Sequence, residues 1–151
     1  MKKILFAASE AVPFMKTGGL ADVTGSLPKY FDKKNYDVRV ILPKYVCMEE
    51  RWKGQLHFLC HFYVNLSWRK QYVGIFETTY DGITYYLVDN EFYFAGNAPY
   101  NNIYEDVEKF AFFSKAVLEA LPYLDFCPDI IHCHDWQTGL LPVFLRTLYG
   151  D

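Results

Sequence analysis

Three short, largely apolar runs along the chain predict strands. The first is Ile4–Ala8, the second is Val38–Leu42, which Pro43 ends, and the third is Ile130–His134. The first run is continuous, which is typical of a strand that is buried on both faces in a parallel sheet. Together the runs predict strands of a parallel sheet.

Three further segments carry apolar residues at helical spacing. In chain order these positions are Leu20, Val23, Leu27, Tyr30 and Phe31; Phe110, Phe113, Val117, Leu121 and Leu124; and Leu141, Phe144, Leu145 and Leu148. Pro28 lies inside the first segment and should kink the helix or split it in two. Asn102 can cap the second helix, with Glu105 reaching back from the third position. Asp135 is placed to cap the third helix.

The middle of the chain has a different pattern. The runs His57–Trp68, Gln71–Thr79 and Ile83–Val88 are rich in β-branched and aromatic residues, and Asp81-Gly82 between the last two is a typical hairpin turn. This pattern predicts an antiparallel β excursion. The chain as a whole is therefore expected to be an α/β protein with a Rossmann-like, doubly wound and mainly parallel sheet into which that excursion is inserted.

Composition narrows the class of protein. The chain has 151 residues, the length of one domain, and its net charge of −3 gives no electrostatic footprint for nucleic acid or a membrane surface. The first apolar run breaks at Ser9-Glu10, too soon for a signal peptide, and no run is long enough to span a membrane. The four cysteines show no paired spacing. We therefore expect a cytoplasmic protein with free thiols.

Two polar clusters are candidates for chemistry. The first is the loop Lys16–Asp22, where Lys16 precedes the pair Gly18-Gly19 between a strand and a helix. Glycines let a backbone approach an anion closely, the helix N-terminus adds partial positive charge, and a lysine suits phosphate. The alternative is an ordinary strand-to-helix turn with a solvated lysine. The loop is therefore a candidate phosphate site.

The second cluster is His132–Gln137, which follows the last predicted strand. His132 and His134 should point to one face of that strand and Cys133 to the other. A zinc site needs three or four ligands, and no further Cys or His pair lies nearby in the sequence. A metal site is therefore the least favoured alternative, beside packed histidines and a sugar or nucleotide site in which Asp135 accepts hydrogen bonds from hydroxyl groups. Because ligands bind beyond the carboxyl ends of parallel strands, both clusters should lie at one edge of the sheet.

Three blocks of sequence, in order, resemble one family. They are Ser9–Val23 (SEAVPFMKTGGLADV), Tyr104–Ala116 (YEDVEKFAFFSKA) and Pro128–Leu140 (PDIIHCHDWQTGL). Each is similar to a segment of the bacterial glycogen synthases and plant starch synthases. The resemblance implies retaining glycosyltransferases of the GT-B architecture, in which two Rossmann-like lobes close on a nucleotide-sugar and an α-1,4-glucan is extended by one glucose.

The resemblance also implies roles for particular residues. Lys16, with Gly18 and Gly19, would contact the phosphates of ADP-glucose. Asp22 is a weaker candidate for a contact with this ligand. Asp135, and less firmly His134, would line the glucose pocket. ADP-glucose and glycogen are the implied partners, and neither a cofactor nor a metal is implied. The N-terminal lobe is also expected to offer surface for binding glucan.

Residues 1–151 are expected to form part of the N-terminal lobe, because the family's further strands and its second lobe are not in this sequence. We therefore expect the piece alone to be inactive. The alternative is a stand-alone glucan- or nucleotide-binding module without catalysis. An unpaired edge at Ile130–His134, together with the apolar faces of the closing helix at Leu141, Phe144 and Leu148, is expected to favour self-association.

Overall fold

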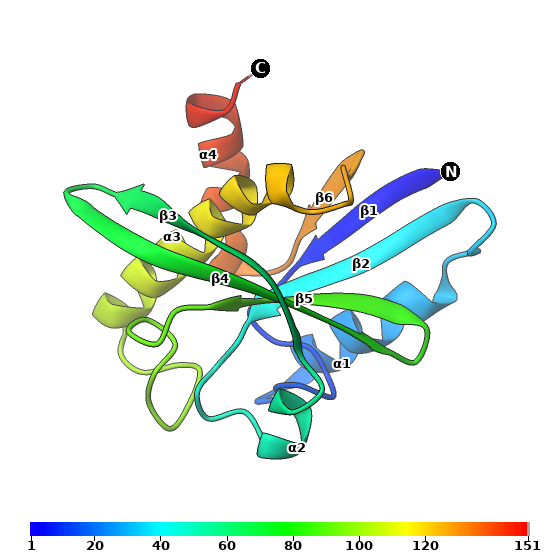
Figure 1. The fold of residues 1–151 in the computed structure, drawn as a ribbon, viewed down its shortest axis with the longest axis horizontal. Helices are drawn as coiled ribbons and strands as arrows, with labels where there is room; N and C mark the ends of the chain where they lie inside the picture. The colour runs from blue at the N-terminus through cyan, green and yellow to red at the C-terminus, as the bar shows by residue number, and fades with distance from the viewer. Residues whose placement is uncertain (151) are drawn as a thin grey trace.

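The computed structural model describes residues 1–150, which form a three-layer α/β fold around one six-stranded sheet (Figure 1). The strands are β1 (Lys2–Ala7), β2 (Tyr36–Pro43), β3 (His57–Leu66), β4 (Arg69–Tyr80), β5 (Ile83–Asp89) and β6 (Ile130–Cys133). The α-helices are α1 (Gly19–Ser26), α2 (Glu50–Lys53), α3 (Ile103–Ala120) and α4 (Leu140–Leu148), and the 3-10 turns are η1 (Leu27–Tyr30), η2 (Leu121–Tyr123) and η3 (Trp136–Thr138). The fold class predicted from the sequence is confirmed.

The order of the strands is β3-β4-β5-β2-β1-β6. The four strands from β5 to β6 are parallel, and β3 and β4 continue the sheet as an antiparallel ribbon. β5 belongs to both parts, because it pairs antiparallel with β4 and parallel with β2. The run that we grouped with the antiparallel excursion is therefore also a central strand of the parallel sheet.

Alternate residues of the strands point to opposite faces of the sheet and pack in two separate hydrophobic cores. Leu5 and Ala7 of β1 face the core that α3 closes with Phe110, Phe113 and Val117. The intervening β1 residues, Ile4 and Phe6, face the other core, which the loop after β1 covers with Ala11 and Phe14. Figure 1 shows α3 and α4 on one side of the twisted sheet and α1 and α2 on the other. The chain thus winds a helix onto each face in turn.

The first helix packs differently from the prediction. Pro28 does split the segment, into α1 and η1. However, the expected stripe is largely exposed, with Val23 and Tyr30 exposed by 48% and 84%. Instead, the short residues of α1, namely Ala21, Thr24 and Gly25, are buried. A Cβ atom at Gly25 would lie 2.3 Å from a side-chain carbon of Val12 and 2.7 Å from its carbonyl oxygen, so close packing selects small residues on this face.

The caps of the later helices follow the sequence in part. The Asn102 side chain accepts a hydrogen bond from the Glu105 N–H, which confirms the predicted cap, whereas the expected return bond from the Asn102 N–H to the Glu105 side chain is not among the hydrogen bonds within residues 1–150. Asp135 does not cap α4, because its carboxylate accepts from the Trp136 N–H at the start of η3 and α4 begins only after Gly139. A separate 3-10 turn therefore lies between Asp135 and the closing helix.

No helix within residues 1–150 has both the length and the apolar character that crossing a bilayer requires.

Candidate functional site

The two polar clusters follow neighbouring strands at the point where the winding of the sheet reverses. From β1 the chain passes to β2 and on to the far edge at β3, comes back through β4 to β5 beside β2, and then crosses over to place β6 on the other side of β1. The His134 N–H donates to the Ala7 carbonyl at 3.1 Å, which joins the carboxyl ends of the two strands. Open α/β sheets bind ligands in the crevice at such a reversal. The expectation that topology brings both clusters to one edge is confirmed.

The glycine pair of the first cluster is not explained by packing within the chain. A Cβ atom at Gly18 or Gly19 would meet no atom within 4 Å, and neither residue has a positive φ. Gly25 in the same helix is the opposite case, because the fold itself excludes a side chain there. Gly18 and Gly19 therefore keep a surface of bare backbone open, which an approaching ligand can use.

Lys16 and Asp22 lie beside this open backbone and are paired with one another. The Lys16 Nζ atom is 2.8 Å from an Asp22 carboxylate oxygen, and each side chain is more than half exposed. An exposed pair of this kind contributes roughly 0–1 kcal/mol, so an incoming anion can compete for the ammonium at little cost. In this structure Asp22 is therefore the ion-pair partner of Lys16.

Asp135 has a strained backbone at the end of β6. Its φ of 64° and ψ of −176° fall in a region that is otherwise occupied almost only by glycine. The Thr138 hydroxyl fixes this bend by donating to the carbonyl oxygen of His134 at 2.9 Å. Strain of this kind costs on the order of 1–3 kcal/mol and is concentrated at functional sites. The exposed Asp135 carboxylate is therefore held at the crevice by its surroundings.

His132 and His134 lie on one face of β6, as predicted. Their rings are 4.3 Å apart and both contact Phe6, whereas Cys133 packs against the core on the α3 side. Within residues 1–150, no group of three or more His, Cys, Asp and Glu side chains is arranged to hold a metal ion. Burial, and to a lesser degree the charge of His132, lowers the pKa of His134 to about 4. His134 is therefore a neutral imidazole near neutral pH.

This depressed pKa predicts a loss of stability in acid. Below its ordinary pKa of 6.5, His134 takes up a proton in the unfolded chain but not in the folded one, until the pH approaches about 4. We therefore expect the free energy of unfolding to fall as the pH drops through this window. Urea unfolding at pH 7.5 and pH 5.0 measures the effect.

The matched variants for this measurement are His134→Asn and His57→Asn, since His57 is exposed at the start of β3. His134→Asn should reduce the difference in unfolding free energy between the two pH values, and His57→Asn should leave it unchanged. An equal pH dependence in all three proteins would contradict the assignment to His134.

The sequence analysis missed Glu10 as a site residue. Glu10 is 1% exposed, and its carboxylate accepts hydrogen bonds from the Thr17 hydroxyl, the Gly18 N–H and the Tyr100 hydroxyl. The signal was present, because Ser9-Glu10 ends an apolar run where a polar pair has no obvious place in a core.

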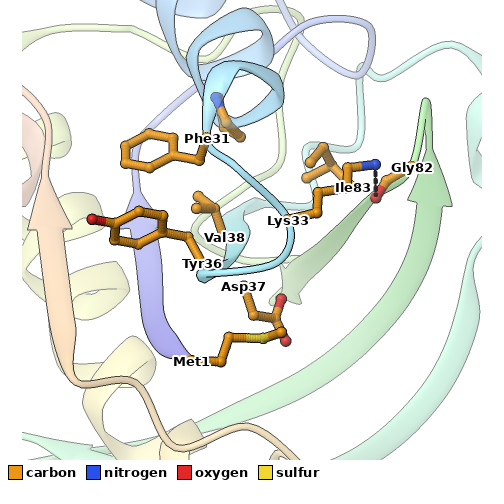
Figure 2. Close-up of a pocket in the computed structure, with 9 residues that line it drawn as sticks. Met1, Phe31, Lys33, Tyr36, Asp37, Val38, Gly82 and Ile83 are labelled. Carbon is orange, nitrogen blue, oxygen red and sulfur yellow. Dashed lines mark hydrogen bonds between the residues drawn. The ribbon is translucent and has the colours of Figure 1, made fainter.

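The hollow drawn in Figure 2 lies elsewhere. It has a volume of about 200 Å³ and is lined by residues such as Phe31, Tyr36 and Ile83. β2 and β5 begin at Tyr36 and Ile83, so the hollow is at the amino ends of the parallel strands. Ligands of doubly wound sheets bind at the opposite ends, so this hollow is not the candidate site.

Known proteins with a similar sequence or fold identify the family of this chain. The family model of the starch synthase catalytic domain matches residues 3–151. This chain belongs to that family. Among solved structures, the catalytic domain of starch synthase IV from Arabidopsis thaliana, bound to ADP and acarbose, superposes with a TM-score of 0.79 and 29% identity. The match covers 99% of this chain and 31% of that one.

Curated relatives are much more similar in sequence. The chain is 70% identical over 146 residues to the glycogen synthase of Lachnoclostridium phytofermentans, which is 97% of this chain and 30% of that protein. It is 64% identical over 151 residues to the glycogen synthase of Lachnospira eligens, which is 100% of this chain and 32% of that protein. The chain therefore spans about a third of the length of these relatives.

Proposed function

We propose that this chain is part of the N-terminal lobe of a glycogen synthase, which transfers glucose from ADP-glucose to the non-reducing end of an α-1,4-glucan with retention of configuration. One observation carries the proposal. The open glycine loop after β1 and the strained Asp135 after β6 flank the same reversal of the sheet. This arrangement suits a ligand that has phosphates at one end and a sugar at the other.

In this proposal the loop binds the diphosphate. The Lys16 ammonium leaves Asp22 to pair with a phosphate, and the bare backbone of Gly19 lets the phosphate approach the first turn of α1. N–H groups in the first turn of a helix have no partner within the helix and carry partial positive charge. The Gly18 N–H does not take part, since it already donates to Glu10 at 3.2 Å.

In the same proposal, Asp135 accepts hydrogen bonds from glucose hydroxyls, and His134 lines the pocket as a neutral group. Once a bound ligand covers them, acceptors of this kind select a hydroxyl-bearing ligand, because a ligand without the hydroxyl leaves them unpaired. The rest of the nucleotide pocket would come from a second Rossmann-like lobe. We also place the enzyme in the cytoplasm, which is supported by the four cysteines, none of which forms a disulfide within residues 1–150.

A hybrid enzyme tests the function. In it, this chain replaces the matching 146-residue segment of the Lachnoclostridium phytofermentans synthase. We expect the hybrid to transfer radiolabelled glucose from ADP-glucose to glycogen. A hybrid that folds, as judged by an unchanged Tm, and yet shows no transfer would contradict the proposal. An inactive hybrid together with binding of ADP-glucose or glycogen by this chain alone would instead favour a binding module.

We further propose that residues 1–151 alone self-associate along the β6 edge. β6 is the last strand of the sheet, Ile130 is 48% exposed, and Val143 and Leu148 of α4 are also about half exposed. Part of the expectation was wrong, because Leu141 is 1% exposed and Phe144 is partly buried, and both pack in the core. Sedimentation should show a dimer or larger species that Ile130→Lys disperses, since a lysine discourages edge pairing. A monomer at high concentration would contradict this.

A further inference from the structure

Glu10 is a buried carboxylate without a cation. The residue is 1% exposed, directly beyond the end of β1, and no lysine, arginine or histidine within residues 1–150 forms an ion pair with it. The nearest lysine in the sequence, Lys16, is paired with Asp22. Burying a carboxylate is expensive unless hydrogen bonds replace its water, so a buried one is retained where its contacts matter.

The hydrogen bonds that replace this water come from the glycine loop and from one tyrosine. The Thr17 hydroxyl donates to Glu10 Oε2 at 2.6 Å, and the Gly18 N–H donates to Glu10 Oε1 at 3.2 Å. The Tyr100 hydroxyl donates to Oε2 at 3.0 Å. Both carboxylate oxygens are therefore occupied, and two of the three donors are the residues that lead directly into α1.

The main chain of Glu10 holds the other side of the same loop. Its carbonyl oxygen accepts a hydrogen bond of 2.6 Å from the hydroxyl of Thr24, a buried residue of α1. The Tyr100 hydroxyl is in turn 2.7 Å from the Ser9 hydroxyl. One residue thus fixes both the entry to α1 and the helix itself, while Lys16, Gly18 and Gly19 remain exposed above it.

We infer that Glu10 is a positioning residue, which holds the glycine loop from beneath so that Lys16 and the open backbone of Gly19 face a nucleoside diphosphate. The inference rests on the proposed function of the loop. Two consequences follow from the contacts. The loop is ordered before the ligand arrives, which lowers the entropic cost of binding. The Gly18 N–H is turned inward, so that it serves the fold and not the phosphate.

Two variants remove one donor each without disturbing the core. Thr17→Val deletes the hydroxyl of an exposed residue, and Tyr100→Phe deletes the hydroxyl on the far side of the carboxylate. In the hybrid synthase we expect each variant to raise the KM for ADP-glucose about fivefold or more and to change kcat less than about twofold, because a looser loop weakens binding of the diphosphate. Glu10→Gln keeps the shape of the side chain, so its KM for ADP-glucose should lie between that of the parent hybrid and those of these two variants.

Matched controls are available far from the loop. Thr147→Val removes a hydroxyl that donates to the Val143 carbonyl at 2.8 Å in α4. Tyr149→Phe removes a hydroxyl that donates to the carboxylate of Glu119, and thus repeats the tyrosine-to-carboxylate bond at another place. Both controls should leave the KM for ADP-glucose unchanged.

A second measurement does not depend on activity. Amide hydrogen exchange of the segment that contains Gly18 and Gly19, followed by mass spectrometry in the hybrid synthase, should be faster in Thr17→Val and in Glu10→Gln than in the hybrid with the parent sequence. If the parent hybrid transfers no glucose, the proposed function fails and the exchange data still test Glu10. If the hybrid is active but the variants change neither KM nor exchange, or lower only Tm, Glu10 does not position the loop.

Discussion

Residues 1–151 on their own are expected to transfer no measurable glucose from ADP-glucose to glycogen. In sugar transfer the departing diphosphate gathers negative charge, and stabilising that charge is usually the largest single contribution to catalysis. Beside the crevice, the loop after β1 provides an exposed lysine, Lys16, and the N-terminus of α1, and in the proposed function these would contact the diphosphate from one side only. A charge stabilised from one side and open to water on the other is screened by solvent.

The assay is incorporation of radiolabelled glucose into glycogen, with the hybrid synthase as the positive control. Transfer by the 151-residue chain at a rate near that of the hybrid would show that one sheet suffices and would refute the two-lobe argument. Weak binding of ADP without transfer agrees with the expectation, because the loop can meet the phosphates without completing the site.

The parts of the fold that could be predicted are those set by local pattern. The apolar runs of β1, β2 and β6, the break at Pro28 and the Asn102 cap each depend on a few neighbouring residues. The meeting of the two polar clusters could also be predicted, because right-handed parallel topology leaves few arrangements. These features need no knowledge of side-chain packing.

The parts that could not be predicted depend on contacts between distant segments. The buried face of α1 consists of Ala21, Thr24 and Gly25, because α1 packs closely against the loop that contains Val12. A hydrophobicity pattern cannot show this, since it gives weight to the large residues. Glu10 was missed for a similar reason, because one of its three hydrogen-bond donors, Tyr100, lies 90 residues away.

The strain at Asp135 was also beyond the reach of the sequence. An aspartate after a strand and before a helix is a typical N-cap, and the capping interpretation was reasonable. The structure instead inserts η3, which the Thr138 hydroxyl closes back onto His134. The Asp135 carboxylate does accept a backbone hydrogen bond, from the Trp136 N–H, but this bond caps η3 beside the crevice and not the beginning of α4. Asp135 follows β6 as the sequence indicates, but its local structure is different, and its role at the site stays a prediction.

Lys16→Ala in the hybrid synthase is expected to reduce kcat/KM for ADP-glucose about tenfold or more, since a hydrogen bond to a charged group contributes roughly 1.5–3 kcal/mol. Thermal stability should change little, because the pair that is lost, Lys16–Asp22, is exposed and contributes roughly 0–1 kcal/mol. The predicted result is a large kinetic effect with an almost unchanged Tm, a combination that separates a ligand-binding lysine from a structural one.

Lys29→Ala is the matched control for this substitution. Lys29 forms an ion pair with Asp81 at 2.9 Å, but it lies on η1 and pairs with the β4–β5 turn, at the amino ends of the parallel strands. Lys29→Ala should reduce the thermal stability as little as Lys16→Ala does, and it should leave kcat/KM for ADP-glucose unchanged. Equal kinetic effects of the two substitutions would mean that surface charge in general attracts the substrate. An unstable Lys16→Ala protein with normal kinetics would mean that Lys16 serves the fold. Loss confined to Lys16 would assign the phosphate contact to the glycine loop.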